Sequence, residues 1–301
     1  MKVQIICFYL TSGKIKIQNR LIWPVWMDAF LLSCKYNTQL EWLIFSDCES
    51  PKSYPSNVRF LPFSLKDFNA LASSKLGFNI NVQNNHNGVP RKIYDFRPAF
   101  GIIFEDYLKG YDWWGHVDLD VILGSIDSFI KPYDFEHFEL ISSRKNALTG
   151  SFTLYKNTKK INELFKLIDK YDGPFFSPGN AHMPNRGTYQ HLWSLPDNQL
   201  ILERNMNQIL RSNPGLVKTK LDKHLFNFSS DRVNARSANI SDISKEESPW
   251  VWVAGSLLWK GKEEVMYAHF PPYRNSIKYI TFSYEDDPDG FILTPDSILA
   301  L

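Results

Sequence analysis

Apolar positions in the first half of the chain fall into runs of strand length separated by amphipathic stretches of helix length. The runs VQIICFYL (3–10), LEWLIFSD (40–47) and NVRFLPFSL (57–65) each have the length of a strand. A continuous apolar run of this kind is typical of a parallel strand that is covered on both faces. The stretch 65–77, which closes with Gly77, has the pattern of a helix.

Two further elements complete the predicted order of this half. The stretch RPAFGIIFEDYLKGY (97–111) has proline near its start and glycine near its end, as helices do, and the segment DWWGHVDLDV that follows contains an aromatic strand. Strands that alternate with helices in this way predict an α/β fold, with a mostly parallel central sheet flanked by helices. Ligands bind such sheets at the carboxyl ends of the strands, and Asp47 and the pair Asp118/Asp120 are expected there.

The remaining elements are less regular. We expect a helix in 19–37 that is interrupted near Pro24, strands at 138–144 and 150–157, helices at 158–171 and 196–212, polar loops at 79–89, 173–191 and 227–248, and a hairpin over 250–270 with its turn around Lys260–Lys262. The chain has 301 residues and shows no repeat and no linker, so we expect one domain.

Composition and charge exclude few classes of function. A formal net charge of +2 gives no electrostatic argument for a nucleic-acid partner. Three cysteines without C-x-x-C spacing point to a reducing compartment. The apolar run at the N-terminus is too short for a signal peptide and no cleavage site follows it, and no run reaches the roughly 18–20 apolar residues of a spanning helix. We therefore expect a cytoplasmic protein.

The pair Asp118 and Asp120 is the strongest chemical signal, because it ends an aromatic strand and precedes the apolar run VILGSI. A second D-x-D, Asp287 and Asp289, lies in EDDPDG and is expected to be an exposed turn. Carboxylates beside a buried strand need a partner. That partner is an arginine or lysine, a row of backbone N–H groups, or a divalent cation such as Mg²⁺ or Mn²⁺.

The segment RKIYDFRPAFGIIFEDYLKGYDWWGHVDLDVILGSI resembles the core of bacterial GT-A-type glycosyltransferases found in polysaccharide (capsule and O-antigen) biosynthesis loci, which carry a W-G-x-x-D-x-D motif. The shared positions are Asp95, Phe96, Pro98, Gly101, Asp112, Trp114, Gly115, Asp118, Asp120 and Gly124, with Arg97 where lysine is common. The segments LTGSFTLYKNTKKINELF (148–165) and MYAHF (266–270) resemble later motifs of the same family. The likeness is good over about residues 90–165 and weak elsewhere.

The resemblance implies a GT-A-like, Rossmann-like domain in which residues 1–125 bind a nucleotide sugar and residues 126–301 bind the acceptor. It implies Mn²⁺ or Mg²⁺ as cofactor, with Asp120 on the metal and Asp118 on the donor's ribose or sugar, directly or through the metal. His269 matches a position that supplies a further metal ligand in such enzymes; a half-buried structural histidine is the alternative.

Five further residues are candidates for the nucleotide site. Asp47 would hydrogen-bond the base, and Phe8 and Tyr9 would pack on it. Asp95 and Arg97 would lie near the nucleotide. For Asp47, Phe8 and Tyr9, a role as cap or core residue is the alternative. For Asp95 and Arg97, the alternative is a structural ion pair between the two.

The acceptor side departs from the family pattern, because the Asp-Glu pair expected after the long loop is replaced by LWSLPDNQLILERN. An inverting enzyme needs a carboxylate that takes the acceptor proton. Asp197 is the first candidate and Glu203 the second, while a plain N-cap is the alternative for Asp197. His182, His191 and Trp193 would shape the acceptor pocket.

The resulting prediction is a metal-dependent hexosyltransferase. It would transfer sugar from a nucleotide diphosphate, most simply a UDP-sugar, to a glycan or lipid-linked oligosaccharide at the inner face of the membrane. The lipid-linked acceptor makes peripheral membrane contact an expectation as well. The competing interpretations are a sugar nucleotidyltransferase and a carbohydrate-binding protein without catalysis.

Overall fold

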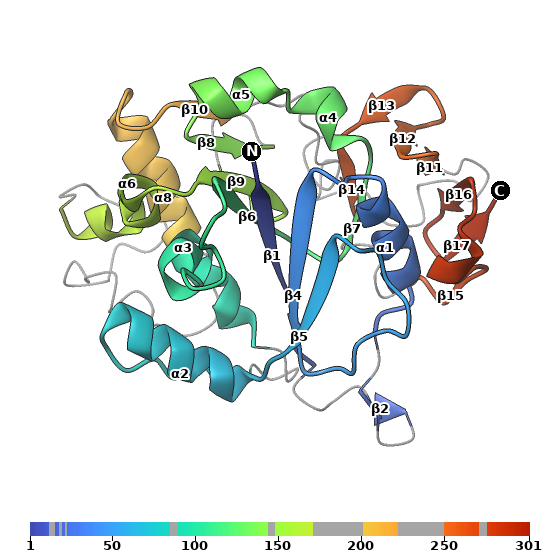
Figure 1. Cartoon of the computed structure of the whole chain (residues 1–301), viewed down its shortest axis with the longest axis horizontal. Coiled ribbons are helices and arrows are strands. Elements are labelled where there is room, and N and C mark those ends of the chain that lie inside the picture. The colour runs from blue at the N-terminus through green and yellow to red at the C-terminus, as the bar shows by residue number, and fades with distance from the viewer. Residues whose placement is uncertain are drawn as a thin grey trace, which may run out of the picture.

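The computed structural model describes residues 1–11, 16–17, 20–21, 23–84, 90–143, 148–170, 201–221, 250–270 and 276–301. Their core is a seven-stranded sheet (Figure 1). Its strands, in spatial order, are β10 (Thr219–Leu221), β8 (Leu140–Ser142), β9 (Phe152–Lys156), β6 (Trp113–Val117), β1 (Val3–Tyr9), β4 (Leu40–Ser46) and β5 (Val58–Pro62). Within it, β9 runs antiparallel to both neighbours and the other pairings are parallel. The predicted α/β class with a mostly parallel sheet is confirmed.

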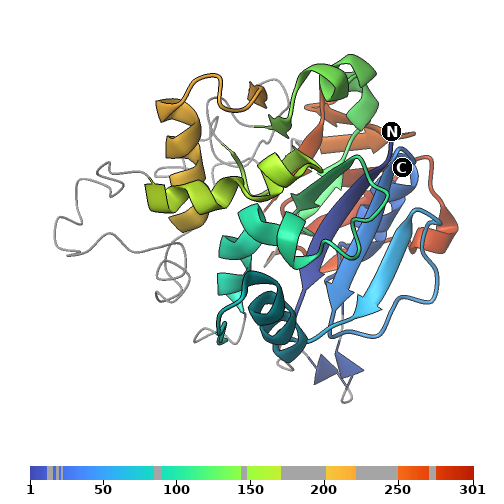
Figure 2. The same ribbon diagram turned by 60° about the vertical axis from the view of Figure 1, so that its left-hand side comes forward.

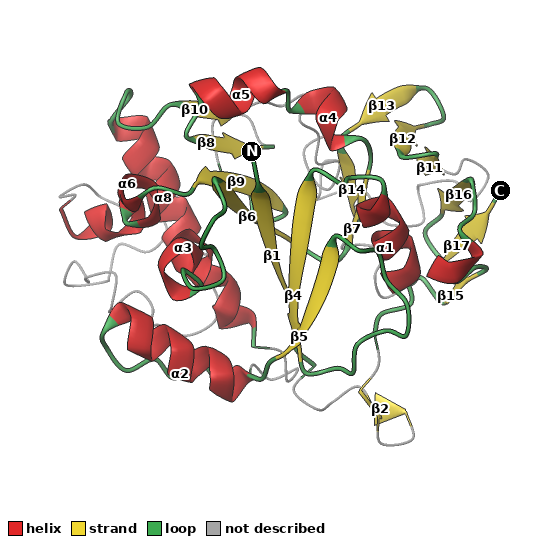
Figure 3. Ribbon diagram, in the orientation of Figure 1, coloured by secondary structure: helices red, strands yellow, loops and turns green. Residues whose placement is uncertain are grey.

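Helices cover both faces of this sheet (Figure 3). The α-helices are α1 (Met27–Lys35), α2 (Leu65–Leu76), α3 (Phe100–Ile103), α4 (Ile126–Phe129), α5 (Pro132–His137), α6 (Lys159–Asn162) and α8 (Ile201–Ser212), and the 3₁₀ helices are η1 (Arg91–Ala99), η2 (Leu164–Lys170) and η4 (Tyr284–Asp286).

The continuous apolar runs of the central strands are explained by two separate cores. In β1, Ile6 and Phe8 face the core under α2, η1 and α3, whereas Ile5 and Cys7 face the core under α1. Successive side chains of a strand point to opposite faces, so a strand buried on both sides is apolar at every position. The same reasoning accounts for the buried β4.

A second sheet packs on the far side of α1. Its strands, in spatial order, are β13 (Glu263–Val265), β12 (Ser256–Trp259), β11 (Trp250–Val253), β16 (Gly290–Leu293), β17 (Ser297–Ala300) and β15 (Tyr279–Ile280). Ala29 and Leu32 of α1 pack against this sheet, while Phe30 and Leu31 pack against the central one. The turned view of Figure 2 places the C-terminal strands and the helices α2 and α3 on opposite sides of the central strands.

Two small sheets complete the described structure. They are the pair β14 (Tyr267–His269) with β7 (Val121–Leu123) and the pair β2 (Lys16–Ile17) with β3 (Arg20–Leu21). No helix within the described ranges is long and apolar enough to cross a membrane.

The prediction of a single helix over 97–111 is wrong. Residues 91–99 wind as a 3₁₀ helix, α3 holds one α-helical turn, and residues 104–110 continue as turns. Backbone bonds such as Tyr107 N to Phe104 O span three residues, as in 3₁₀ winding. The apolar spacing was informative all the same, because Phe96, Phe100 and Phe104 are buried in one core. The spacing of the apolar residues identifies the buried face, but it does not distinguish α-helical from 3₁₀ winding, which depends on tertiary packing.

Three other expectations need correction. The helix expected at 158–171 is divided into α6 and the 3₁₀ helix η2. Before Pro24 the chain forms β3 rather than helix. The hairpin expected over 250–270 is four short strands, and the turn at Ala254 and Gly255, both at positive φ, was missed. The expected loops at 173–191 and 227–248 lie outside the described residues.

Candidate metal and donor site

The loop that carries Asp118 and Asp120 joins β6 to β7 at the carboxyl end of β6, in the middle of the central sheet. All five residues of β6 are buried. Gly115 is required there, because a Cβ at this position would lie 2.7 Å from the carbonyl oxygen of Thr153 on β9. Strand β6 pairs with β1 on one side and β9 on the other, and the N–H of Asp118 continues the pairing with a bond to the Ser151 carbonyl, so the start of the loop is held as well.

His269 reaches this loop through a strand that is distant in sequence. Strand β14 pairs antiparallel with β7, so that His269 lies opposite Val121. The backbone N–H of Phe270 donates to the carbonyl of Asp120 at 3.1 Å. The pairing of β7 with β14 is what places the imidazole beside the two carboxylates.

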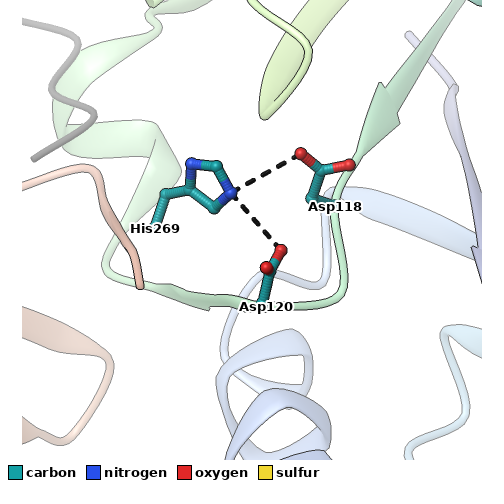
Figure 4. A group of neighbouring side chains, drawn as sticks. All are labelled: Asp118, Asp120 and His269. Atoms are coloured by element: carbon teal, nitrogen blue, oxygen red, sulfur yellow. Dashed lines mark ion pairs between the residues drawn. The ribbon is translucent and has the colours of Figure 1, made fainter. Parts of the chain in front are cut away.

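The three side chains converge on one point (Figure 4). Nε2 of His269 lies 3.6 Å from Oδ2 of Asp118 and 3.3 Å from Oδ1 of Asp120. One ligand atom from each residue lies within 4.8 Å of the other two. Two carboxylates and one imidazole form a donor set that could hold a divalent cation.

A protein cation also contacts this group. The Arg97 guanidinium forms an ion pair with Oδ1 of Asp118, and it lies over the ring of Tyr94, with 4.6 Å from Cζ to the ring centroid. One of the partners considered for the aspartate pair, an arginine, is thus present for Asp118. Burial raises the pKa of Asp118 above its ordinary value; Arg97 and His269 oppose that rise and Asp120 adds to it.

The Nε2 side of the His269 imidazole is compatible with a metal ion, and the Nδ1 side neither adds to this nor opposes it. Its Nδ1 is buried and has no hydrogen-bond partner among the described residues. If Nε2 carries the proton, the Nδ1 lone pair is buried unsatisfied; if Nδ1 carries it, the Nε2 lone pair faces two carboxylates. A cation between Nε2 and the carboxylates removes the second conflict, because neutral imidazole binds metals through such a lone pair.

The predicted base-binding residues have partners within the protein. Asp47 directly follows β4, and its two carboxylate oxygens accept bonds from Thr11, from N–H at 2.8 Å and from the hydroxyl at 3.1 Å. Tyr9 is half-buried and stacks on Trp23, with ring centroids 5.2 Å apart. Phe8 is buried among aromatic rings of the core and stacks on Phe45. Their nucleotide roles stay predictions.

Asp95 lies on η1 in a buried ion pair with Lys92, at 2.6 Å. The alternative considered for Asp95 is a structural pair with Arg97, whereas the described ion pairs join Asp95 to Lys92 and Arg97 to Asp118. Its role near the nucleotide stays a prediction.

The predicted acceptor side is largely beyond the described structure. Asp197, His182, His191 and Trp193 lie in 171–200, outside the described residues. Glu203 lies in α8, whose first residues are described by their backbone alone. Asp197 and Glu203 therefore remain predictions as catalytic bases.

One contact at the site was not anticipated from sequence. The indole N–H of Trp26 donates to the carbonyl of Leu119, between the two aspartates, at 2.9 Å. Trp26 lies 93 residues before Leu119 in sequence, and no local pattern signals such a pairing.

Comparison with known proteins gives a family. The model of a family of unknown function, DUF6625, matches residues 22–301. This chain belongs to that family. No curated protein matches it.

Several solved structures resemble this DUF6625 protein distantly, each at 10% sequence identity. A galactosyltransferase, LgtC, in complex with donor and acceptor sugar analogs has a TM-score of 0.42, with 88% of this chain and 86% of that chain covered. Mouse xyloside xylosyltransferase 1 has a TM-score of 0.48, with 89% and 97% covered. The glycosyltransferase GlyE of Streptococcus pneumoniae has a TM-score of 0.36, with 76% and 46% covered.

The chemistry available to the DUF6625 protein follows from its own residues. Asp118, Asp120 and Arg97 together carry one net negative charge when both carboxylates are ionised. A bound divalent cation would reverse that sign. The site would then attract an anion such as a diphosphate at the carboxyl ends of the strands, which is where α/β sheets bind ligands.

Proposed function

We propose that this protein is a metal-dependent glycosyltransferase. It would transfer a hexose from a nucleotide diphosphate sugar, in particular a UDP-sugar, to a glycan or lipid-linked oligosaccharide in surface polysaccharide synthesis. The observation that carries the proposal is the convergence of Asp118, Asp120 and His269 at the carboxyl end of β6. The residues of this group come from two segments, 91–126 and 266–270, that resemble motifs of GT-A-type enzymes, the second of them loosely.

The three residues would hold Mn²⁺ or Mg²⁺. When bound, such a cation supplies charge neutralisation to a diphosphate leaving group. Asp118 would bind the donor's ribose or sugar as well, with Arg97 fixing the carboxylate from the other side. Because Arg97 forms an ion pair with Asp118, its guanidinium is a candidate partner for the diphosphate as well.

The remaining roles follow the same proposal. Asp47 and Tyr9, at the ends of β4 and β1, would border the base, with Phe8 supporting them from the core. Asp197 or Glu203 would take the proton from the acceptor hydroxyl if the enzyme inverts. We propose residues 1–125 as the donor half and 126–301 as the acceptor half, and the inner membrane face as the place where a lipid-linked acceptor would be met.

A donor screen tests the proposal. We expect release of UDP from one UDP-sugar in the presence of Mn²⁺, and loss of that release when the metal is chelated. Release of pyrophosphate from UTP and a sugar 1-phosphate would instead favour a nucleotidyltransferase. Glycan binding that needs neither metal nor UDP would favour a binding protein.

A matched pair of variants assigns the activity to the site. Asp120→Asn should reduce UDP release by at least about 100-fold, a loss typical of removing a charge that stabilises the transition state. Asp289→Asn changes the exposed second D-x-D in the same way and should leave the rate unchanged. Mn²⁺ binding followed by electron paramagnetic resonance should be lost in the first variant alone. Equal rates in the two variants would refute the metal role of Asp120.

A further inference from the structure

The loop of Asp118, Leu119 and Asp120 lies between β6 and β7, and each of its residues is tied to a different segment. At its two ends these bonds continue the β6–β9 and β7–β14 pairings. The N–H of Asp118 donates to the Ser151 carbonyl at 3.4 Å, beside β9. The Leu119 carbonyl accepts from the Trp26 indole at 2.9 Å, and the Asp120 carbonyl accepts from the Phe270 N–H at 3.1 Å. Of these three bonds, only the one from Trp26 uses a side-chain atom.

Trp26 is held rigidly enough to act as a fixed support. It is the N-cap residue of α1, and its carbonyl accepts the N–H of Phe30 at 3.0 Å. Helix α1 is itself buried between the central sheet and the second sheet. The indole N–H therefore projects from a helix end that cannot shift without disturbing both cores.

The same ring contacts the other half of the site. Trp26 packs edge-on against Phe270, with ring centroids 5.6 Å apart. Phe270 directly follows His269 and is buried. One side chain thus touches the aspartate loop through its N–H and the histidine strand through its ring.

We propose that Trp26 is a positioning residue for divalent-cation binding, which aligns the Asp118–Asp120 loop with His269. This inference rests on the proposed metal site. Small divalent cations require well-placed oxygen ligands. Replacement of an outer group that orients the metal ligands typically changes the affinity for the metal by about 10- to 100-fold. Without its N–H donor the Leu119 carbonyl loses its tether, and the two carboxylates gain freedom relative to the imidazole.

The chain offers a matched control. The indole N–H of Trp252 donates to the carbonyl of Leu123, also at 2.9 Å. This is the same kind of bond, to a residue of β7 four positions further along the chain. Trp252 shares a core cluster with Phe270, but its described hydrogen bond and ring contacts go to Leu123, Tyr36 and Phe291 and not to the aspartate loop or Phe270. It is also more deeply buried than Trp26, so its loss should cost stability at least as much.

The experiment compares wild type, Trp26→Phe and Trp252→Phe. Titration with Mn²⁺ alone, followed by electron paramagnetic resonance, gives the dissociation constant, and thermal melting without metal gives stability. We expect Trp26→Phe to bind Mn²⁺ about 10-fold more weakly. Trp252→Phe should bind as wild type does, although it melts at the same or a lower temperature than Trp26→Phe. If Trp26→Phe does not fold, 3-benzothienylalanine at position 26 keeps the shape of the ring and lacks the N–H.

The outcomes separate the two proposals. Wild-type binding retained in Trp26→Phe would overturn the positioning role and leave the metal site intact. Equal weakening in both variants would also overturn it, because general loosening would then explain the result. Wild type that binds no Mn²⁺ would overturn the proposed function, and the role of Trp26 with it.

Discussion

Replacement of Arg97 with methionine tests how a buried cation and a metal ion share Asp118. The Arg97 side chain is 7% exposed and that of Asp118 is 20% exposed. Removal of one partner from a buried ion pair costs about 3–5 kcal/mol. Because Asp118 keeps some contact with solvent, we expect the lower end, about 3 kcal/mol, which is about 6 °C in melting temperature for a chain of this size.

The same substitution should strengthen metal binding. A divalent cation bound to Asp118 would lie on the order of 6 Å from the guanidinium, where even the dielectric constant of water would leave a repulsion of about 1.4 kcal/mol. Removal of that repulsion should tighten Mn²⁺ binding about tenfold. Arg97→Met is thus expected to be less stable than wild type without metal, and to be stabilised more than wild type when metal binds. General damage to the fold does not produce this combination.

The control is Lys92→Met, which removes the cation of the other buried ion pair on η1. Its partner Asp95 is 4% exposed, so the loss of stability should equal or exceed that of Arg97→Met. Mn²⁺ affinity should not change. Melting curves with and without Mn²⁺, together with Mn²⁺ titration, measure both quantities. Binding in Arg97→Met that is no tighter than in wild type would refute the view that Arg97 and the metal compete for Asp118.

Two further predictions concern the scaffold of the site. Gly115→Ala would place a Cβ 2.7 Å from the Thr153 carbonyl oxygen. We expect the free energy of unfolding, measured by thermal melting, to fall by about 1–3 kcal/mol. An unchanged melting temperature would show that β6 and β9 can move apart to admit the methyl group. Asn37 bridges α1 to the segment after β7, since its amide donates to the carbonyls of Ser33 and Gly124 and its oxygen accepts from Ile126 N–H. Asn37→Ala should lower the free energy of unfolding by about 1–3 kcal/mol for each buried group left unsatisfied. The control Asn213→Ala removes one half-buried bond to the Ile209 carbonyl and should lower it less. Equal losses in the two variants would contradict the bridging role of Asn37.

Much of the first half was predictable because its signals are local. The strands β1 and β4 follow from apolar runs, and α2 follows from its amphipathic pattern and from Gly77, which closes it at a φ of 79°. Residues 97–111 show which feature the local sequence signals did not predict. Their spacing identified the buried face, but the choice between α and 3₁₀ winding was made by packing against the central sheet.

The sequence by itself determined the class of fold and the position of Asp118 and Asp120 at the end of a buried strand, because both depend on residues close together in the chain. The resemblance of residues 266–270 suggested His269 as a further ligand, and the β7–β14 pairing brings it to the loop. Only the tertiary structure decided that Arg97 and Trp26 also meet this loop, through η1 and through the end of α1. Contacts between residues this far apart in sequence depend on how whole elements pack, and a single chain's local pattern of apolar and polar positions carries no record of that packing.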